Sequence, residues 1–385
     1  MWASKLVDRD NRQQSREFRD PVLDLAIVIP AHNEAAVLGS TLESLTTITG
    51  NRAQIHVIAD HCRDATTSIA AQAGVHVHVR NDRGPAGKGA ALHWWLARTS
   101  AHSSPEQIII VMDADSRVTP DFIECIKTYF ANGTRAAQAR LEPSISSTTP
   151  LELLSSLSEI VEHRVCDSLR ARLGWPVRLR GTGMFFRRGL LEKYSPSLHT
   201  SVEDLELTVL LGADDEPIVY VPQIVVYDPK PIDPRGAVHQ RARWLRGQFQ
   251  VIRDYAAQIL RLLFRGPKGW SLISAGLLKP RTFALPFKVF SVLLFLHMAF
   301  TEAGLLWRIA AAIGCASVLV DVELYLYALR YTRYPWKTFV ALAASPLFFF
   351  LWLQSLALAI VHRQRWLSSR RSIADPPRQR STQAP

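Results

Sequence analysis

The first half of the chain alternates short apolar runs with stretches of helical spacing. The apolar runs are rich in β-branched residues and predict buried strands, at residues 25–30, 55–59, 75–79 and 108–112. Between them, apolar residues recur three or four positions apart, and this spacing predicts helices over residues 35–45, 65–73 and 89–95. Strands that alternate with helices at this pace indicate an α/β fold with a mostly parallel sheet flanked by helices.

The second half is more apolar. Residues 251–264 mix large apolar residues with arginines, a pattern typical of a helix lying in the bilayer interface. Residues 339–361 carry no charge and exceed the ~20 residues that a membrane span needs. Residues 282–300 and 305–329 are further candidates interrupted by charges, so we expect three spans, with two as the alternative. The orientation is not settled, because three spans would put the basic tail outside, against the positive-inside tendency.

These patterns divide the chain into five parts. A charged segment (1–24) precedes an α/β domain (25–250), interfacial helices (251–281), membrane helices (282–362) and a basic, disordered tail (363–385). Residues 140–175 within the α/β domain read as largely helical, with Leu151, Leu154, Leu157 and Val161 on one core-facing stripe.

Charge and cysteine content narrow the class of protein. Lys+Arg 45 against Asp+Glu 34 gives a formal net charge of +11, and basic flanks beside apolar segments suit an anionic membrane surface or phosphate-bearing substrates. No surface motif interleaves aromatic and basic residues, so we expect no nucleic acid partner. The four scattered cysteines argue against a disulfide framework or zinc site. The first 24 residues are too charged for a signal peptide, which predicts a cytoplasmic α/β domain on the cell inner membrane.

Two carboxylates, Asp113 and Asp115, follow the most apolar strand. The carboxyl end of a parallel strand is where open α/β sheets bind ligands. Two acids at that edge can share a divalent cation, Mg²⁺ or Mn²⁺, which can in turn hold a diphosphate. The alternative is a pair of solvated turn residues, which a lone Asp-x-Asp does not exclude.

Other polar residues follow the neighbouring strands. Glu34 could accept a hydrogen bond from a ribose hydroxyl, and Asp60 could accept one from the imide N–H of uracil. Lys88 stands between two glycines, which add no side-chain bulk and allow close approach to a phosphate. Each residue alone could be a turn or capping residue. Together, at successive turns on one edge of the sheet, they predict a site for a nucleoside diphosphate.

Six motifs in this order resemble family 2 glycosyltransferases of the GT-A fold. The match is nearest to the membrane-bound branch that includes cellulose, chitin and hyaluronan synthases, and it covers residues 25–250. The motifs are Pro30-Ala-His-Asn-Glu34, Ala59-Asp-His-Cys-Arg-Asp-Ala-Thr66, Gly87-Lys-Gly89, Met112-Asp-Ala-Asp-Ser116, Ser201-Val-Glu-Asp-Leu205 and Gln240-Arg-Ala-Arg-Trp244. The fifth resembles the Thr-Glu-Asp motif of that branch, and the last matches its Gln-x-x-Arg-Trp motif.

The resemblance implies a role for each site residue. Asp204 is the general base, and a metal ion is held by Asp113 and Asp115. The nucleotide sugar is bound by Pro30, Glu34, Asp60, Lys88, Asp113, Asp115, Gln240 and Arg243, and the acceptor by Gly181, Thr182, Gly183, Glu203 and Trp244. Three parts of this set have open alternatives: the Gly-Thr-Gly stretch as a tight strand-entry turn, Trp244 as a core residue, and Glu203 as a group that orients Asp204.

The implied function is inverting transfer of a sugar from a nucleotide-diphosphate sugar, favoured as a UDP-sugar, to a glycan or lipid-linked saccharide. Such an enzyme would form a β-glycosidic bond in exopolysaccharide or cell-surface glycan synthesis, with membrane lipids and subunits of a glycan export system as partners. The alternatives are a processive β-polysaccharide synthase and a non-catalytic nucleotide-sugar-binding protein. We expect no membrane span before residue 25, which favours single transfer or a polymerase that needs a partner.

Overall fold

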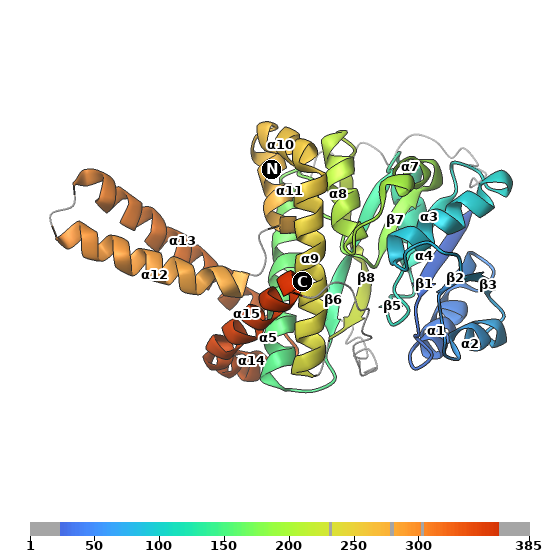
Figure 1. Ribbon diagram of the computed structural model, residues 1–385, viewed down its shortest axis with the longest axis horizontal. Coiled ribbons are helices and arrows are strands. Elements are labelled where there is room, and N and C mark those ends of the chain that lie inside the picture. The colour runs from blue at the N-terminus through green and yellow to red at the C-terminus, as the bar shows by residue number, and fades with distance from the viewer. Residues whose placement is uncertain (1–23, 231–232, 278–280, 302–303, 362–385) are drawn as a thin grey trace, which may run out of the picture.

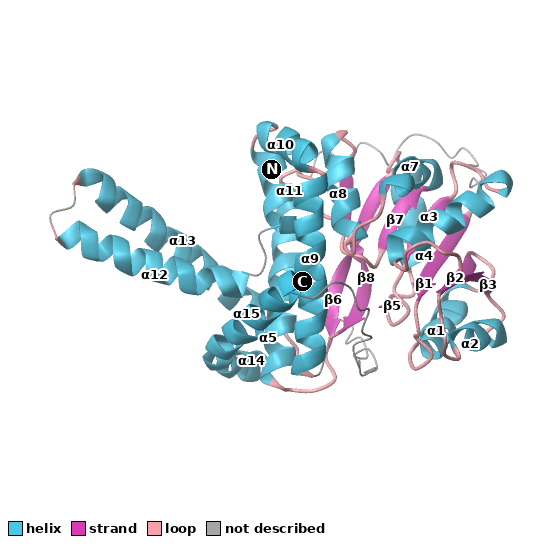
Figure 2. Cartoon of the chain, viewed as in Figure 1, coloured by secondary structure: helices cyan, strands magenta, loops and turns pink. Residues whose placement is uncertain are grey.

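A computed structural model describes residues 24–230, 233–277, 281–301 and 304–361. The predictions for residues 1–23 and for the basic tail lie outside the described residues. The body is an eight-stranded sheet in the order β3-β2-β1-β4-β7-β6-β8-β5, with helices packed on it (Figures 1 and 2).

The four predicted strands form one half of this sheet. They are β1 (Leu25–Ala31), β2 (Gln54–Asp60), β3 (His76–Arg80) and β4 (Ile108–Val111), and all three pairings among them are parallel. Successive β1 residues enter opposite cores: Ile27 and Ile29 pack in one cluster, Ala26 and Val28 in the other. A strand buried on both faces reads as a continuous apolar run, and this is why the sequence revealed these strands.

The other half is mixed, but four of the seven strand pairings in the sheet, including that of β6 with β8, are parallel, as expected. Here β7 pairs antiparallel with β4 and with β6, and β5 pairs antiparallel with β8. The strands are β5 (Arg117–Val118), β6 (Ala136–Ser144), β7 (Met184–Arg187) and β8 (Ile218–Pro229). The helical reading of residues 140–144 was wrong, because β6 has few β-branched residues and its charged side chains obscure the strand pattern.

Helices cover both faces of the sheet. One face carries α1 (Leu38–Thr49), α2 (Thr66–Gln72) and α4 (Phe122–Ala131). The other carries α3 (Lys88–Thr99), α7 (Arg188–Tyr194) and α8 (Glu203–Ala213). Short 3-10 turns lie at Ser100–His102 and Ser195–Ser197. The predicted α/β class, a sheet flanked by helices, is confirmed.

Longer helices pack beside the β6–β8 end of the sheet (Figure 1). One continuous helical run consists of α5 (Pro150–Glu159), the π-helical segment η2 (Ile160–Cys166) and α6 (Asp167–Arg172). The stripe predicted on this run, Leu151, Leu154, Leu157 and Val161, is buried as expected. After it come α9 (Pro234–Asp254), α10 (Ala256–Phe264) and α11 (Pro267–Leu277), so the predicted interfacial helix over 251–264 is divided between the end of α9 and α10.

The C-terminal helices correct the prediction of three membrane spans. Figure 1 shows α12 (Arg281–Phe300) and α13 (Leu305–Leu329) as a hairpin that projects from the body. Among the described residues, α13 is the one unbroken helix long and apolar enough to cross a membrane. Residues 339–361, the favoured span, are broken into α14 (Pro335–Ala341), a 3-10 turn at Leu342–Ala344 and α15 (Ser345–Val361).

The break has a local cause. Pro346 lacks the backbone N–H that a continuous helix would need there, so a new helix starts at Ser345. A separate bend of 44° lies between Pro335–Phe348 and Phe350–Val361, and these two segments qualify as a span only if taken together. A multi-pass arrangement is therefore not supported, and α15 instead packs against α9.

One charged pair joins the projecting hairpin. The ammonium of Lys288 on α12 lies 2.7 Å from the carboxylate of Asp321 on α13, and Asp321 is buried. Both charges were interruptions in the apolar pattern, and a buried charge is costly unless it is paired. The pair therefore explains how the two helices carry these residues at their contact.

Candidate active site

Asp60 is held at the end of β2 by an ion pair that strand register creates. Parallel pairing places Asp60 opposite Arg80 of β3, and their charged groups lie 2.7 Å apart with both side chains buried. The other carboxylate oxygen of Asp60 accepts a hydrogen bond from the backbone N–H of Gly87. Asp60 thus links the predicted base-binding position to the glycine-flanked Lys88 loop.

The turn that carries Glu34 is tied to the turn after β2. The backbone N–H of Glu34 donates to the hydroxyl of Thr66, at 2.8 Å, and the side-chain carbonyl of Asn33 accepts from the N–H of Arg63. Asn33 and His61 both have left-handed backbones, with φ of 57° and 52°. Such conformations are uncommon outside glycine and cluster at functional sites. The two turns, with Pro30 at the end of β1 beside them, form one rigid edge.

Lys88 joins three parts of the predicted site. It is the first residue of α3, and its ammonium donates to the carboxylate of Asp113 and to the carbonyl of Gly181. Burial opposes its charged form, but the carboxylates of Asp113, Glu203 and Asp204 outweigh burial and raise the pKa of Lys88. Lys88 is therefore a fixed cation at the carboxyl edge of the sheet.

The Gly181-Thr182-Gly183 turn is hydrogen-bonded to the loop that carries Asp113. Thr182 is 1% exposed, and its hydroxyl accepts from the backbone N–H of Asp113 and bonds to Ser116. Gly181 and Gly183 have φ of 85° and 62°, and a Cβ at Gly183 would lie 2.9 Å from the side chain of Val226. The geometry fits the strand-entry turn; the acceptor role of these residues stays a prediction.

Glu203 and Asp204 begin α8 and lie in different environments. Glu203 is buried, and burial raises its pKa to about 7, with the cation of Lys88 opposing and the charge of Asp204 adding to the rise. Asp204 accepts a hydrogen bond from the guanidinium of Arg178, at 3.3 Å. Of two adjacent carboxyl groups in different environments, one can stay protonated while the other accepts a proton.

The Gln-x-x-Arg-Trp motif lies on α9, which packs against the start of α8. The hydroxyl of Ser201 donates to the backbone carbonyl of Arg243, and a Cβ at Gly247 would lie 2.6 Å from Val202. Gln240 and Arg243 are half-buried on this helix. Trp244 is 41% exposed, so the core alternative for this tryptophan is wrong. The motif is thus placed next to the Glu203-Asp204 turn.

The carboxylates suit a hard divalent cation. Asp113 is partly exposed and Asp115 is buried two residues on, at the edge where Lys88 supplies positive charge. No group of three or more His, Cys, Asp or Glu side chains that could hold a metal occurs among the described residues. Mg²⁺ and Mn²⁺ accept one or two carboxylates completed by substrate phosphates and water, so this oxygen donor set fits such an ion bound together with a diphosphate.

Two arginines of the site, Arg80 and Arg178, were not predicted. Arg80 holds Asp60, and Arg178 donates to Asp204 and to the carbonyl oxygens of Ala275 and Gly276 on α11. The pairing of Arg80 with Asp60 could have been predicted, because each is the last residue of its strand and neighbouring parallel strands align their ends. For Arg178 the partner lies 26 residues away and on another element, which no local spacing reveals.

Replacing Gly89 by alanine should weaken donor binding. A Cβ there would lie 2.9 Å from Leu198 Cβ and 3.2 Å from Glu203 Cβ, so α3 would have to move away from Leu198 and from the start of α8. We expect a loss of roughly 1–3 kcal/mol in the free energy of unfolding and a raised KM for the donor. Thermal melts measure the stability, and initial rates at varied donor concentration measure the KM. The control is Gly304→Ala, where an added Cβ meets open space; Gly133→Ala is unsuitable because Gly133 has a positive φ. An unchanged melting temperature of Gly89→Ala would contradict the packing argument.

Comparisons with known proteins find similarity over most of the α/β domain. Residues 21–247 match the family model described as glycosyltransferase like family 2. The chain is 26% identical over 264 residues to a β-monoglucosyldiacylglycerol synthase of Synechocystis sp., covering 65% of this chain and 52% of that protein. A protein of the same name from Nostoc sp. is 25% identical, over 68% of this chain and 57% of its own length. The chain thus spans little more than half the length of these relatives.

Among solved structures, a similar one is a mannosyltransferase from Pyrobaculum calidifontis in complex with GDP-mannose and Mn²⁺. It is 17% identical, with a TM-score of 0.48 over 84% of this chain and 86% of that chain.

Proposed function

The chain belongs to the family of that matching model, glycosyltransferase like family 2, and from this premise we propose that it transfers a sugar from a nucleotide-diphosphate sugar to the hydroxyl of a lipid acceptor. The motif resemblance and the GT-A type α/β fold are confirmed with the family. The narrower likeness to cellulose, chitin and hyaluronan synthases stays a prediction. The single observation that carries the proposal is the convergence of Lys88, Asp113 and the Glu203-Asp204 turn at one edge of the sheet.

The proposed chemistry has two requirements. A bond forms between the acceptor oxygen and the anomeric carbon while the bond to the diphosphate oxygen breaks, and the acceptor proton must leave. Asp204 takes that proton, with Arg178 holding its carboxylate in place. Lys88 and Arg243 offer positive charge to the diphosphate, and Gln240 a hydrogen bond. A Mg²⁺ or Mn²⁺ ion held by Asp113 and Asp115 would neutralise charge on the leaving group.

Attack from the face opposite the diphosphate inverts the anomeric centre. An α-linked donor, which we favour as a UDP-sugar held at Asp60 and Glu34, then gives a β-linked product. Trp244, whose ring is exposed on α9, provides an apolar face for the acceptor, as aromatic rings do for sugars.

A lipid acceptor is favoured over a growing polysaccharide by two features. Two of the similar proteins, those of Synechocystis sp. and Nostoc sp., are named β-monoglucosyldiacylglycerol synthases, although a more distant one from Arabidopsis thaliana is named glucomannan 4-β-mannosyltransferase 7. The site also adjoins helices that expose large apolar residues, among them Phe264 and Trp270 on α10 and α11. Large exposed apolar surface beside a site suits contact with a membrane. Processive synthesis of a β-polysaccharide is the second candidate.

The deciding experiment incubates the detergent-purified chain with a panel of UDP- and GDP-sugars, with diacylglycerol or a lipid-linked saccharide as acceptor. Mass spectrometry of extracted lipid should show one added hexose with one donor, in the presence of Mn²⁺ or Mg²⁺. A ladder of many added sugars would favour the processive candidate. If no donor is consumed with any acceptor, including a native lipid extract, the transferase proposal fails.

Arg178→Met should lower kcat about ten-fold, with the donor KM within two-fold, because the arginine positions Asp204 without touching the donor. The acid limb of the pH–activity profile should move to higher pH, since removing the cation makes the neighbouring carboxylates hold protons more tightly. Arg178→Lys keeps the charge and should recover part of the rate. An unchanged pH profile in Arg178→Met would show that the arginine only supports packing.

A further inference from the structure

Exposed cations and aromatic rings gather where α13 meets the body. The guanidinium of Arg330 lies 4.6 Å from the ring centre of Tyr327, and Arg333 and Lys337 lie 5.4 Å and 5.3 Å from that of Tyr334. None of these three cations forms an ion pair with a carboxylate of the described residues. We call residues 327–340 the basic tyrosine segment; it offers positive charge that no described acid neutralises.

Large apolar side chains are exposed beside those cations. In the same segment, Trp336 is 74% exposed and stacks on Phe339 with ring centres 5.7 Å apart, and Val340 is exposed next to them. Tyrosine and tryptophan side chains favour the boundary between hydrocarbon and water, because one end is apolar and the other polar. The segment therefore has the composition of a membrane–water boundary.

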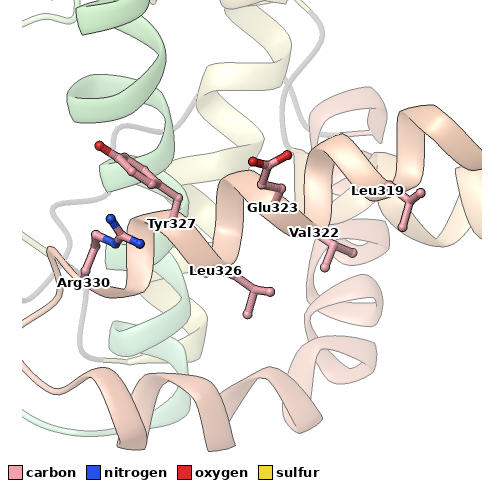
Figure 3. A pocket seen from close by; sticks show the side chains of 6 residues that line it. All are labelled: Leu319, Val322, Glu323, Leu326, Tyr327 and Arg330. Carbon is pink, nitrogen blue, oxygen red and sulfur yellow. The ribbon is translucent and has the colours of Figure 1, made fainter.

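A shallow, open depression of about 470 Å³ lies along one side of α13 and reaches this segment at Tyr327 and Arg330; its six lining residues all belong to α13, and we call it the α13 groove (Figure 3). Leu319, Val322 and Leu326 point to one side of the helix, whereas the carboxylate of Glu323 points away from them. Tyr327 and Arg330 line the end nearest the body. The groove thus has an apolar length and a basic, aromatic end.

Its dimensions match one leaflet of a bilayer. From Leu319 to Arg330 the helix advances 11 residues, which is about 16 Å at ~1.5 Å per residue. The hydrocarbon core of a bilayer is ~30 Å thick, so one leaflet is about half of that. The whole of α13, at 25 residues, is long enough for the full thickness.

We propose that the α13 groove and the basic tyrosine segment form a binding site for one anionic phospholipid. An acyl chain lies along Leu319, Val322 and Leu326, and the phosphate lies between Arg330 and Arg333. The occupant is a lipid because three of the six lining residues are aliphatic and lie on one side of the helix. It is anionic because the exposed cations of the basic tyrosine segment outnumber the one acid of the lining, Glu323, whose carboxylate points away from the aliphatic side chains. This site does not depend on the transferase reaction.

The test measures equilibrium binding of radiolabelled phosphatidylglycerol to the full chain in neutral detergent micelles. Phosphatidylcholine serves as a lipid without net charge, and glycerol 3-phosphate as the headgroup without acyl chains. Arg330→Gln/Arg333→Gln should lower affinity for phosphatidylglycerol roughly ten- to thirty-fold, because each cation near an anionic lipid contributes about 1 kcal/mol of attraction. Binding of phosphatidylcholine should stay unchanged. Leu319→Asn/Leu326→Asn should weaken binding of both lipids.

The matched control is Arg98→Gln/Arg172→Gln, which removes two exposed cations from the body, one of them also lying over an aromatic ring. It should bind phosphatidylglycerol like the parent chain. Melting temperatures verify that each variant is folded. The proposal is overturned if folded Arg330→Gln/Arg333→Gln binds phosphatidylglycerol normally, if phosphatidylcholine binds equally well to the parent, or if glycerol 3-phosphate displaces the lipid at equal concentration.

Discussion

Asp204→Asn should reduce kcat by roughly 10²–10⁴-fold, the range by which a positioned general base accelerates proton transfer. Asparagine keeps the shape and can still meet the guanidinium of Arg178, but it cannot take a proton from the acceptor hydroxyl. Donor binding should change little, because the loss concerns the transition state and not the ground state. Initial rates of lipid product at saturating donor and acceptor, together with a donor dissociation constant from calorimetry, give the two quantities.

The matched control is Asp214→Asn, the same chemical change just beyond the other end of α8. Asp214 accepts hydrogen bonds from Tyr194 and Lys193 at the surface, so its variant should keep the parental rate. Glu203→Gln separates the two neighbouring carboxyls: it should lower activity less than Asp204→Asn does. If Asp204→Asn keeps more than a tenth of the parental kcat while Glu203→Gln is inactive, the buried glutamate is the proton acceptor instead.

Asp115→Asn should lower kcat by roughly 10²–10³-fold, the usual cost of removing one preorganised stabiliser of developing charge. The buried carboxylate is half of the pair that fits a divalent cation, and the amide that replaces it carries no charge. Treating the parent chain with a chelator should abolish turnover, and Mn²⁺ or Mg²⁺ should restore it. Calorimetry should also show that nucleoside diphosphate binds the parent more tightly when the metal is present.

Asp121→Asn provides the control, since this exposed aspartate lies six residues further along and outside the Lys88–Asp113 cluster. It should respond to metal like the parent. Turnover that persists in the chelator, or a nucleotide affinity that Mn²⁺ and Mg²⁺ leave unchanged, would remove the metal from the proposed mechanism. Lys88 and Arg243 would then carry the charge of the leaving group alone.

The sequence predicted the parts of the site in which local chemistry and fold coincide. Two of its residues, Asp60 and Asp113, stand at the ends of apolar strands, and Lys88 lies between two glycines. These residues come close together because parallel strands bring their carboxyl ends to one edge of the sheet. Thr182 was found as a residue, but its buried contact with the Asp113 turn depends on β4 and β7 being adjacent. Pairings between distant, weakly patterned strands leave little trace in local spacing.

The membrane helices were harder for a related reason. Hydropathy counts apolar residues but cannot detect a bend or break in a helix. It therefore favoured residues 339–361 as a membrane span over α13, although the structure breaks the former and keeps the latter continuous. The charges of Lys288 and Asp321 lowered the ranking of α12 and α13, although in the structure they neutralise each other. Ion pairing across a hairpin is a property of two segments and is invisible in either alone.

The contact between α8 and the α10–α11 pair limits how this enzyme can be divided or recombined. A Cβ at Gly212 would lie 2.6 Å from Leu272, one at Gly276 would overlap Leu205, and Arg178 binds the last carbonyls of α11. A chimaera that joined residues 25–250 to the C-terminal helices of a relative would mismatch all three contacts at once. Among related proteins we therefore expect coordinated substitutions at positions 178, 205 and 212 and in the α10–α11 pair. The unit that must be kept intact extends through residue 277.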